Sequence, residues 1–350
     1  MTSNARRVTA SGRDIAVIRL QDHRHAVFRH GDRESMRLLR ALHRRPSRLT
    51  RLGLALLGGS AVVARVAEQA RPAEPACRSR CAELFEAVAE FLDGDVVSYA
   101  ATVNSAVEWA IIGVRRRADI VFVTVRTPDH PAIAEQATFL RDFENVCPPS
   151  VLIPRVVREG QAGGWSMLAL TNLDPPDRTP EVELRRLLPY LNAMCEADHR
   201  DVTYAQTLAE LETTGALAEP LASVLAGPGD ADRTLRLCRA HGDFVPWNMA
   251  LDGEALYLWD WSRAMRVAPW PFDAVHFCSQ RRRHELHQSR ETALAGARDD
   301  LAEVAGELGV ARDPAALDRA IALYAAFRYA HELRVQLMGS DTVWLVENAL

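Results

Sequence analysis

The chain has 350 residues, a length that suits about two domains, each with its own hydrophobic core. Hydrophobic residues make up 48%, charged residues 25%, and the net charge is −4. This composition excludes a strongly basic nucleic-acid-binding chain, and no nucleic-acid partner is expected. All 42 basic residues are arginine, so chemistry that commonly uses a lysine must here use a guanidinium or be missing.

Two further features bear on location. The six cysteines show neither a pairing pattern nor a metal-ligand spacing, which is typical of free thiols in a reducing compartment. The most apolar early run, residues 52–66, is interrupted by Gly58-Gly59-Ser60 and by Arg65, so we expect no membrane span. Both features favour a cytoplasmic protein.

Residues 1–80 are an Arg-rich extension with an expected hairpin, at residues 14–20 and 25–30, followed by helix over residues 34–70. A Pro-containing linker is expected at residues 71–75. Two interpretations of the extension stay open. Its Arg density suits a docking module for a protein partner, whereas its helical pattern suits a structural extension packed on the next domain.

Residues 81–173 predict a small β-rich domain. Short β-branched runs separated by turn residues indicate strands, and an apolar stripe at helical spacing indicates a helix. After a first helix at residues 81–92, the expected order is strand, strand, strand, helix, strand, strand. The expected elements are strands at 95–101, 107–114 and 119–126, a helix at 130–143, and strands at 154–157 and 165–170.

Residues 174–350 predict a larger helical domain. The expected helices cover residues 179–198, 204–225, 284–308 and 314–338. Asp313 is the expected N-cap of the last one, with a proline at its first position and a glycine just beyond its end. The β-like piece expected in this half is the stretch at residues 241–261, which reads HGDFVPWNMALDGEALYLWDW.

That stretch contains one of two His-Gly-Asp tripeptides in the chain. Five residues after Asp243 comes Asn248, and an apolar strand then leads to Asp260. The other tripeptide, at residues 30–32, is followed by Arg37 at the same distance and is interpreted as a chance match. A carboxylate that can act as a base, followed by two oxygen ligands for a hard cation, is the set that phosphoryl transfer requires.

The motifs HGDFVPWN at residues 241–248, WDW at 259–261 and PWPFD at 269–273 resemble those of the aminoglycoside phosphotransferase and choline kinase family. The resemblance covers roughly the last 250 residues. It implies an α+β, two-lobe protein-kinase-like fold. The small β-rich N-lobe would be residues 81–173 and the larger helical C-lobe 174–350, with the N-terminal extension outside.

The resemblance also implies roles for single residues. Asp243 would accept the proton of the attacking hydroxyl, and Asn248 and Asp260 would hold Mg²⁺ against the phosphates of ATP. His241 would orient the loop through hydrogen bonds. Asp273 would support the loop without touching substrate.

The nucleotide half departs from the family pattern. The third strand of the domain ends at Arg126, where the family has a lysine that binds phosphate, and Glu135 in the next helix is its expected partner. Because a guanidinium is larger and planar, this replacement is not neutral.

The turn expected to cover the phosphates, residues 102–106, has no glycine, so Asn104 and Ser105 are the expected donors there. The adenine hinge is expected at residues 169–172, with Thr171 as a contact. These positions follow from the resemblance.

The resulting hypothesis is an ATP-dependent phosphotransferase with a hydroxyl group as acceptor. Arg263, Arg266 and the Arg281–Arg283 run follow the site motifs and disfavour a polycationic drug as acceptor. A small molecule or a Ser or Thr of a precursor peptide in a natural-product pathway is the acceptor that the resemblance implies. The alternative is a degenerate kinase that binds a partner or a nucleotide without turnover.

Overall fold

The computed structural model describes residues 15–19, 24–29, 32–42, 75–104, 106–175, 182–213, 234–335 and Trp344. The chain divides into two compact units. The N-unit comprises Met1–Ala137 and Pro154–Asn172, and the C-unit comprises Thr138–Ile153 and Leu173–Leu350. The division falls inside helix α5 (Pro131–Glu144), whose first half belongs to the N-unit. Among the described helices, none is long and apolar enough for a membrane crossing.

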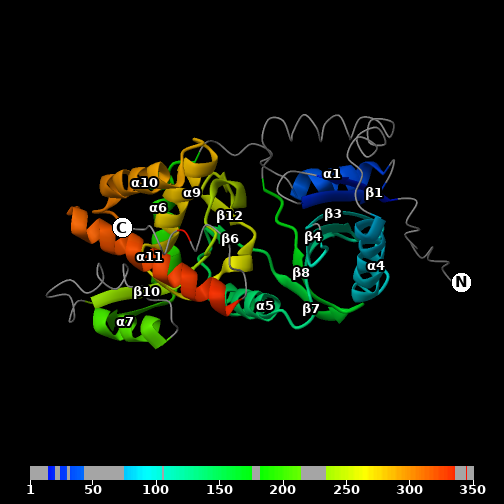
Figure 1. The fold of residues 1–350 in the computed structure, drawn as a ribbon, viewed down its shortest axis with the longest axis horizontal. Coiled ribbons are helices and arrows are strands. Elements are labelled where there is room, and N and C mark those ends of the chain that lie inside the picture. Colours follow the sequence, from blue (N-terminus) through cyan, green and yellow to red (C-terminus); the bar gives the residue numbers. More distant parts are fainter. Residues whose placement is uncertain are drawn as a thin grey trace, which may run out of the picture. The chain divides into compact units, whose positions relative to one another are not determined.

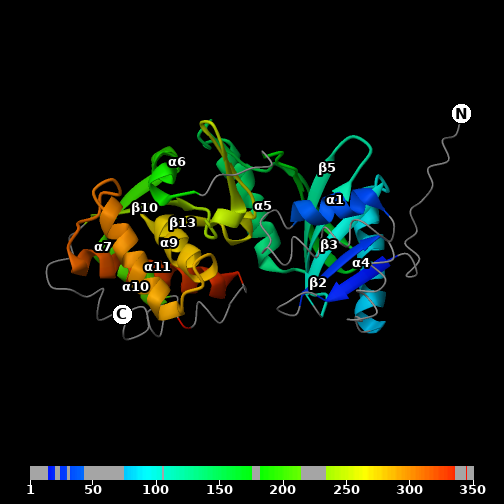
Figure 2. The same ribbon diagram turned by 90° about the horizontal axis from the view of Figure 1, so that it is seen from above.

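The N-unit contains a seven-stranded antiparallel sheet, seen from two directions in Figure 1 and Figure 2. Its strand order is β1-β2-β3-β4-β5-β8-β7. The strands are β1 (Ile15–Arg19), β2 (Arg24–Arg29), β3 (Ser98–Asn104), β4 (Trp109–Arg115), β5 (Ile120–Arg126), β7 (Val156–Ala162) and β8 (Trp165–Thr171).

Both faces of this sheet carry buried residues, because alternate residues of β1, β2 and β3 enter different hydrophobic clusters. Ile15 and Val17 of β1 lie in the cluster that includes helix α4 (Pro75–Phe91), whereas Ala16 lies in the one that includes helix α1 (Arg33–Leu42). The two helices therefore cover opposite faces.

The hairpin of β1 and β2 corrects the expected domain boundary near residue 80. Strand β2 pairs with β3 over its length, with Ala26 opposite Thr102. The described part of the N-terminal region thus belongs to the same sheet as the rest of the N-unit. Without the hairpin, β3 would present an unpaired edge, which proteins generally cover. Helix α1 accounts for residues 33–42 of the expected long helix, and the rest of that expectation lies outside the described residues.

Asp32 of the first His-Gly-Asp tripeptide caps α1. Its carboxylate accepts hydrogen bonds from the Glu34 backbone N–H (2.9 Å), the Ser35 hydroxyl (3.0 Å) and the Ser98 hydroxyl (2.5 Å). Because Ser98 lies on β3, the cap also attaches the helix to the sheet. Asp32 therefore has a structural role, which agrees with the interpretation of this tripeptide as a chance match.

The C-unit is mainly helical, with two three-stranded sheets of orders β13-β10-β9 and β11-β12-β6. Its strands are β6 (Val151–Leu152), β9 (His199–Thr203), β10 (Thr234–Ala240), β11 (Met249–Asp252), β12 (Ala255–Leu258) and β13 (Met265–Pro269). Its helices, besides the second half of α5, are α6 (Leu184–Ala197), α7 (Tyr204–Thr213), α9 (Phe272–His284), α10 (Arg290–Val304) and α11 (Pro314–Arg334) (Figure 1).

Three expectations for this half need correction or completion. The stretch at residues 241–261 is not its one β-like piece, since β9, β10 and β13 form a second small sheet. The helix expected over 284–308 is α10, which starts only at Arg290, and α9, which ends at His284, was not expected. Asp313 does cap α11, accepting from the Ala316 N–H at 2.9 Å.

Replacing the α1 cap should destabilise the N-unit. Asp32→Ala removes the acceptor of one backbone N–H and two hydroxyls, so the free energy of unfolding should fall by about 1–2 kcal/mol. Hydrogen exchange read by mass spectrometry should show lost protection in α1 and β3. Asp95→Ala is the control, because it removes only an exposed ion pair with Arg117 (3.7 Å). Equal protection in the two variants would contradict the capping role.

Candidate active site

The site residues of the C-unit lie on the loop between β10 and β11, residues 241–248, and on the elements that hold it. The loop ends in a short 3₁₀ turn, Pro246–Asn248, from which β11 starts. Strands β11 and β12 then form a hairpin in which Met249 pairs with Leu258. Asp260 follows β12, so the hairpin returns the chain to the end at which Asn248 lies.

Asp273, in the first turn of α9, fixes the start of the loop. Its carboxylate accepts from the backbone N–H of His241 (2.7 Å) and of Gly242 (3.0 Å), and the side chain is buried. Burial raises the pKa of Asp273, and the two N–H donors act in the opposite direction. The supporting role expected for Asp273 is thus visible in the hydrogen bonds.

Gly242 is the residue that permits this geometry. Its φ is +79°, and a Cβ built on it would lie 1.8 Å from the carbonyl oxygen of Arg263. No side chain fits there without moving the backbone of Arg263. The glycine of the His-Gly-Asp motif is therefore required by a close approach of two backbone segments.

His241 connects the loop to the end of β12. Its Nδ1 accepts from the Asp243 N–H (3.3 Å), so the proton lies on Nε2, which donates to the Trp259 carbonyl (2.9 Å). The ring is buried and packs 4.5 Å from the ring of Trp261, itself buried. As expected, His241 orients the loop. Trp261 belongs to the core.

Both carboxylate oxygens of Asp243 form hydrogen bonds, and the side chain is partly exposed to solvent. Its Oδ1 lies 3.0 Å from Nε2 of His276, its Oδ2 accepts from Nδ2 of Asn248 at 2.9 Å, and the side chain is 24% exposed. Burial alone would raise the pKa of Asp243, but the hydrogen bond from His276, helped by the charge of Arg263, holds it well below the usual range. At neutral pH Asp243 is therefore ionised and can accept a proton.

Asn248 presents its amide oxygen away from Asp243. Its Nδ2 donates to both the backbone carbonyl (3.1 Å) and the carboxylate (2.9 Å) of Asp243, which fixes the orientation of the amide. The backbone carbonyl of Asn248 accepts from the Trp259 N–H at 3.1 Å, next to Asp260. The hairpin thus brings the Asn248 amide and the Asp260 carboxylate to one end.

Asp260 has a left-handed backbone, with φ 60° and ψ 61°, and its Oδ1 accepts from the Ser262 hydroxyl at 2.7 Å. Non-glycine residues seldom adopt this conformation, and such positions cluster at functional sites. An amide oxygen and a carboxylate are hard donors of the kind that Mg²⁺ takes alongside phosphate oxygens. Among the described residues, no group of three or more His, Cys, Asp or Glu side chains suits a metal by itself.

Four residues behind Asp243 form a buried polar chain that the sequence motifs do not indicate: His276, Tyr324, Arg328 and Glu332. The first lies on α9, whose existence was not foreseen, and the other three lie on α11. The sequence does contain a feature that points to the three residues on α11. An arginine and a glutamate four residues apart follow directly on the apolar run at residues 320–327, and buried charges need partners.

The residues expected to bind nucleotide belong to the N-unit. Arg126 is the last residue of β5, and its guanidinium lies 5.4 Å from the ring centre of Trp109. Burial, followed by the charge of Arg126, lowers the pKa of nearby His130. Glu135 lies in the N-unit half of α5. The pairing of Arg126 with Glu135 stays a prediction.

Two other expected nucleotide contacts have structural hydrogen bonds. The Oδ1 of Asn104 accepts from the N–H groups of Glu108 (2.7 Å) and Trp109 (3.1 Å), which closes the turn between β3 and β4. The hydroxyl of Thr171 accepts from the Arg155 N–H at 2.9 Å. Ser105 lies outside the described residues. The phosphate and adenine contacts therefore also stay predictions.

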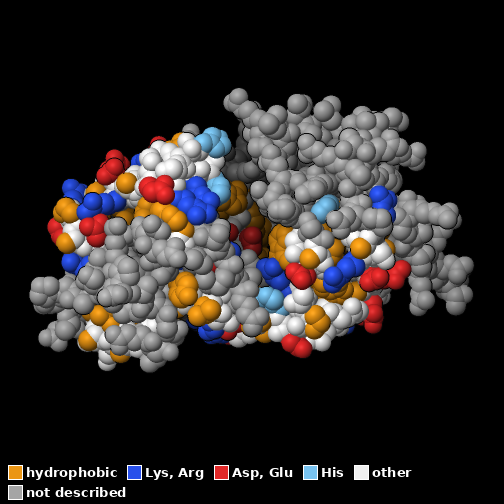
Figure 3. Space-filling model, in the orientation of Figure 1, with side chains coloured by type: hydrophobic (Ala, Val, Ile, Leu, Met, Phe, Trp, Pro, Cys, Tyr) orange, Lys and Arg blue, Asp and Glu red, His pale blue; other side chains and the backbone are white. Residues whose placement is uncertain are grey.

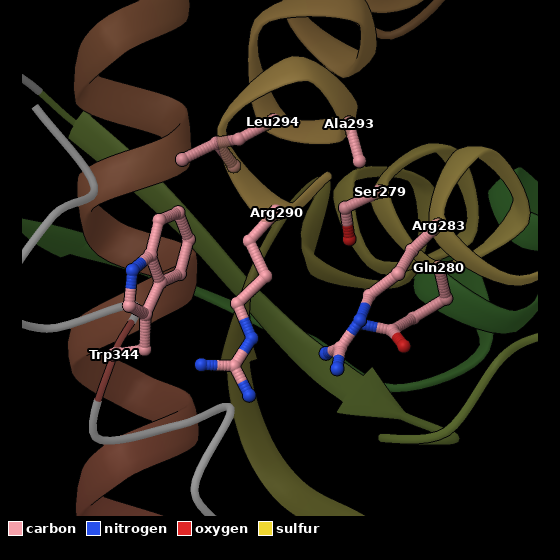
Figure 4. A pocket seen from close by; sticks show the side chains of 7 residues that line it. All are labelled: Ser279, Gln280, Arg283, Arg290, Ala293, Leu294 and Trp344. Carbon is pink, nitrogen blue, oxygen red and sulfur yellow. The ribbon is translucent and has the colours of Figure 1, made fainter. Parts of the chain in front are cut away.

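A small pocket lies along α9 and α10, one to two turns beyond His276 on the same helix. It is lined by Ser279, Gln280, Arg283, Arg290, Ala293, Leu294 and Trp344 (Figure 4). The neighbouring arginines of the run have acidic partners: Arg282 forms two hydrogen bonds with Asp300 (2.7 and 2.6 Å), and Arg281 lies 3.6 Å from Glu285. Acidic and basic side chains are likewise interspersed on the face shown in Figure 3.

Comparison with known proteins gives matches in structure. No family model matches the chain, and no curated protein matches its sequence. A thermostable mutant of aminoglycoside phosphotransferase APH(4)-Ia, in a ternary complex with ADP and hygromycin B, superposes with a TM-score of 0.50 at 14% identity, covering 76% of this chain and 96% of that one.

Two further structures are similar. The apo form of a thermostable mutant of APH(4)-Ia has a TM-score of 0.48 at 11% identity and covers 75% of this chain and 96% of that chain. A fructosamine-3-kinase homologue from Haemophilus somnus has a TM-score of 0.42 at 13% identity and covers 76% and 96%. The ADP-bound structure, with the β-rich N-unit and helical C-unit, confirms the resemblance at the level of fold: the chain has the protein-kinase-like α+β fold of the aminoglycoside phosphotransferases.

Proposed function

We propose that this protein is an ATP-dependent phosphotransferase that transfers the γ-phosphoryl group of ATP to an alcohol hydroxyl. The observation that carries the proposal is the arrangement of Asp243, Asn248 and Asp260 on one loop and hairpin. The base is ionised and partly exposed, and the two oxygen donors lie at the same end of the hairpin. The fold supports the proposal, since the ADP-bound structure similar to this chain is a phosphotransferase.

In this reaction the acceptor oxygen attacks the γ-phosphorus, the bond to the bridging oxygen of the β-phosphate breaks, and ADP leaves. Asp243 orients the hydroxyl and takes its proton, a contribution typically worth about 10²–10⁴-fold in rate. Asn248 and Asp260 would hold Mg²⁺, which when bound neutralises charge on the phosphate oxygens. Asp273 and His241 keep the loop in place while this occurs.

The acceptor that we propose is a hydroxyl of a small molecule or of a peptide Ser or Thr in a natural-product pathway. The Arg281–Arg283 run on α9, the helix that carries Asp273 and His276, supports an acceptor that is not a polycation. A polycation would meet like charges on that helix.

The second candidate is binding of nucleotide without turnover. One observation favours it: the side-chain oxygen of Asn104 closes the turn that would cover the phosphates, and that turn contains no glycine. Close approach of backbone N–H groups to phosphate is harder without glycine. The two candidates agree on Mg·ATP binding and differ on turnover.

Mg·ATP should stabilise the parent protein. At a ligand concentration of about 100 times Kd, binding adds about 2.7 kcal/mol, which corresponds to a rise of roughly 2–4 °C in the Tm measured by thermal denaturation. Asp260→Ala, or EDTA with the parent, should remove most of this rise. The control is Asp252→Ala, at the exposed turn of the same hairpin, which should keep it. A parent Tm insensitive to Mg·ATP would overturn both candidate functions.

Turnover separates the two candidates. Asp243→Asn should keep the Mg·ATP-dependent rise in Tm and lower the rate of ADP release, or of labelled phosphate transfer, by about 10²–10⁴-fold. Acceptors to compare are Ser- and Thr-containing peptides, neutral polyols and an aminoglycoside. A parent that binds Mg·ATP but releases no ADP with any of them would favour the binding-only candidate. Transfer that survives in Asp243→Asn would remove Asp243 from the proposed role.

A further inference from the structure

We propose that His276 is a positioning residue for Asp243: a neutral imidazole whose Nε2–H holds the carboxylate in the orientation that the acceptor hydroxyl requires. The inference rests on the proposed function, because it assigns a support to the base of that reaction. It concerns a residue that the sequence motifs do not include.

His276 lies on α9, the helix that also carries Asp273. Asp273 and His276 are three residues apart, so they lie on the same side of the helix, one turn apart. Asp273 binds the backbone of residues 241 and 242, and His276 binds the side chain of Asp243 at 3.0 Å. One turn of one helix therefore fixes both the main chain of the loop and the carboxylate that the loop presents.

The protonation state of His276 follows from its neighbours. Its Nδ1 lies 3.0 Å from Nη1 of Arg328 and 2.8 Å from the hydroxyl of Tyr324. A guanidinium can only donate, so Nδ1 must present its lone pair. The ring proton is then on Nε2, where it points to Oδ1 of Asp243. A protonated ring would place an N–H against the N–H of Arg328.

Burial and the charges of two neighbouring arginines all lower the pKa of His276. His276 is fully buried, and its pKa is lowered to about 4 by burial first, with the charges of Arg328 and Arg263 acting in the same direction and the bond to Asp243 opposing them. The ring is therefore neutral at physiological pH. It donates a hydrogen bond to Asp243 without forming a full ion pair with it, and the carboxylate remains available to a second donor.

Arg328 is itself held in place. Its Nε donates to Glu332 at 3.0 Å, and its Nη1 donates to the Tyr324 hydroxyl at 2.7 Å. Glu332 also accepts from Arg263, whose backbone packs against Gly242 of the loop. The groups that face His276 are thus Asp243, Tyr324 and Arg328. The two positive charges of Arg263 and Arg328 are matched by the negative charges of Glu332 and Asp243.

The functional consequence concerns rotation of the carboxylate. Asn248 holds Oδ2 of Asp243 and His276 holds Oδ1. Removal of the second donor frees the terminal torsion of Asp243, which is broad and soft by itself. Misorientation of a base by a fraction of an ångström slows the chemical step, whereas nucleotide affinity does not depend on it.

A matched pair of variants isolates the hydrogen bond. In His276→Gln the amide nitrogen can occupy the place of Nε2 and donate to Asp243. In His276→Asn the shorter amide can accept from Arg328 in the place of Nδ1 but does not reach Asp243. Both replacements leave a polar group for Arg328, and thermal denaturation checks that each variant is folded.

With the most active acceptor found for the parent, we expect kcat to fall about 10–100-fold in His276→Asn and to recover to within about tenfold of the parent in His276→Gln, with the KM for Mg·ATP little changed in both. A purely structural role would lower kcat equally in both variants or change KM, and would overturn the proposal. So would an unchanged kcat in His276→Asn.

A second readout does not depend on turnover. In ¹⁵N NMR of the parent, with His276→Gln used for assignment, the His276 ring should show a proton on Nε2 and a bare Nδ1 from pH 8 to about pH 5. A ring that titrates near the ordinary value of about 6.5, or one protonated on Nδ1, would overturn the proposal even if the enzyme is active. If the parent shows no turnover but the NMR result holds, the proposed function fails and the hydrogen-bonded geometry stands.

Discussion

A buried carboxylate that has to be satisfied, Asp273, controls the geometry of the candidate site. Its two oxygens take the backbone N–H groups of consecutive residues, His241 and Gly242, and this is possible because Gly242 adopts a positive φ beside the backbone of Arg263. The loop cannot change its course without leaving a buried charge unpaired, which is costly. The position of Asp243 follows from that constraint.

Helix α9, which carries Asp273, fixes the side chain of Asp243 as well as the main chain of the loop. His276 lies one turn beyond Asp273 and reaches the carboxylate of Asp243, and its own orientation depends on Arg328 and Tyr324. Buried ion pairs such as Arg328 with Glu332 add little stability compared with apolar packing. Their presence in the apolar helix α11 is better explained by the orientation they give to groups near the loop.

The N-unit has a different organisation. Its sheet is buried on both faces and is extended by the β1–β2 hairpin, so its N-terminal strands are part of the core and not an appendage. The side chains of the N-unit that are expected to bind phosphate make contacts within that unit. Asn104 closes a turn, and Arg126, at the end of β5, lies over an aromatic ring. A guanidinium in the place of a compact ammonium alters how phosphate can be bound.

The sequence by itself determined the fold class and the residues of the candidate site loop. The spacing of Asp243, Asn248 and Asp260 is local, and a short loop and hairpin translate it directly into proximity. Only the tertiary structure decided which residues stand behind them. His276 and Arg328 are 52 positions apart in the chain and meet because α9 and α11 pack together. Likewise, the pairing of β2 with β3 joins segments more than 70 residues apart. No local pattern encodes such contacts, because they depend on how separate elements bury their apolar faces.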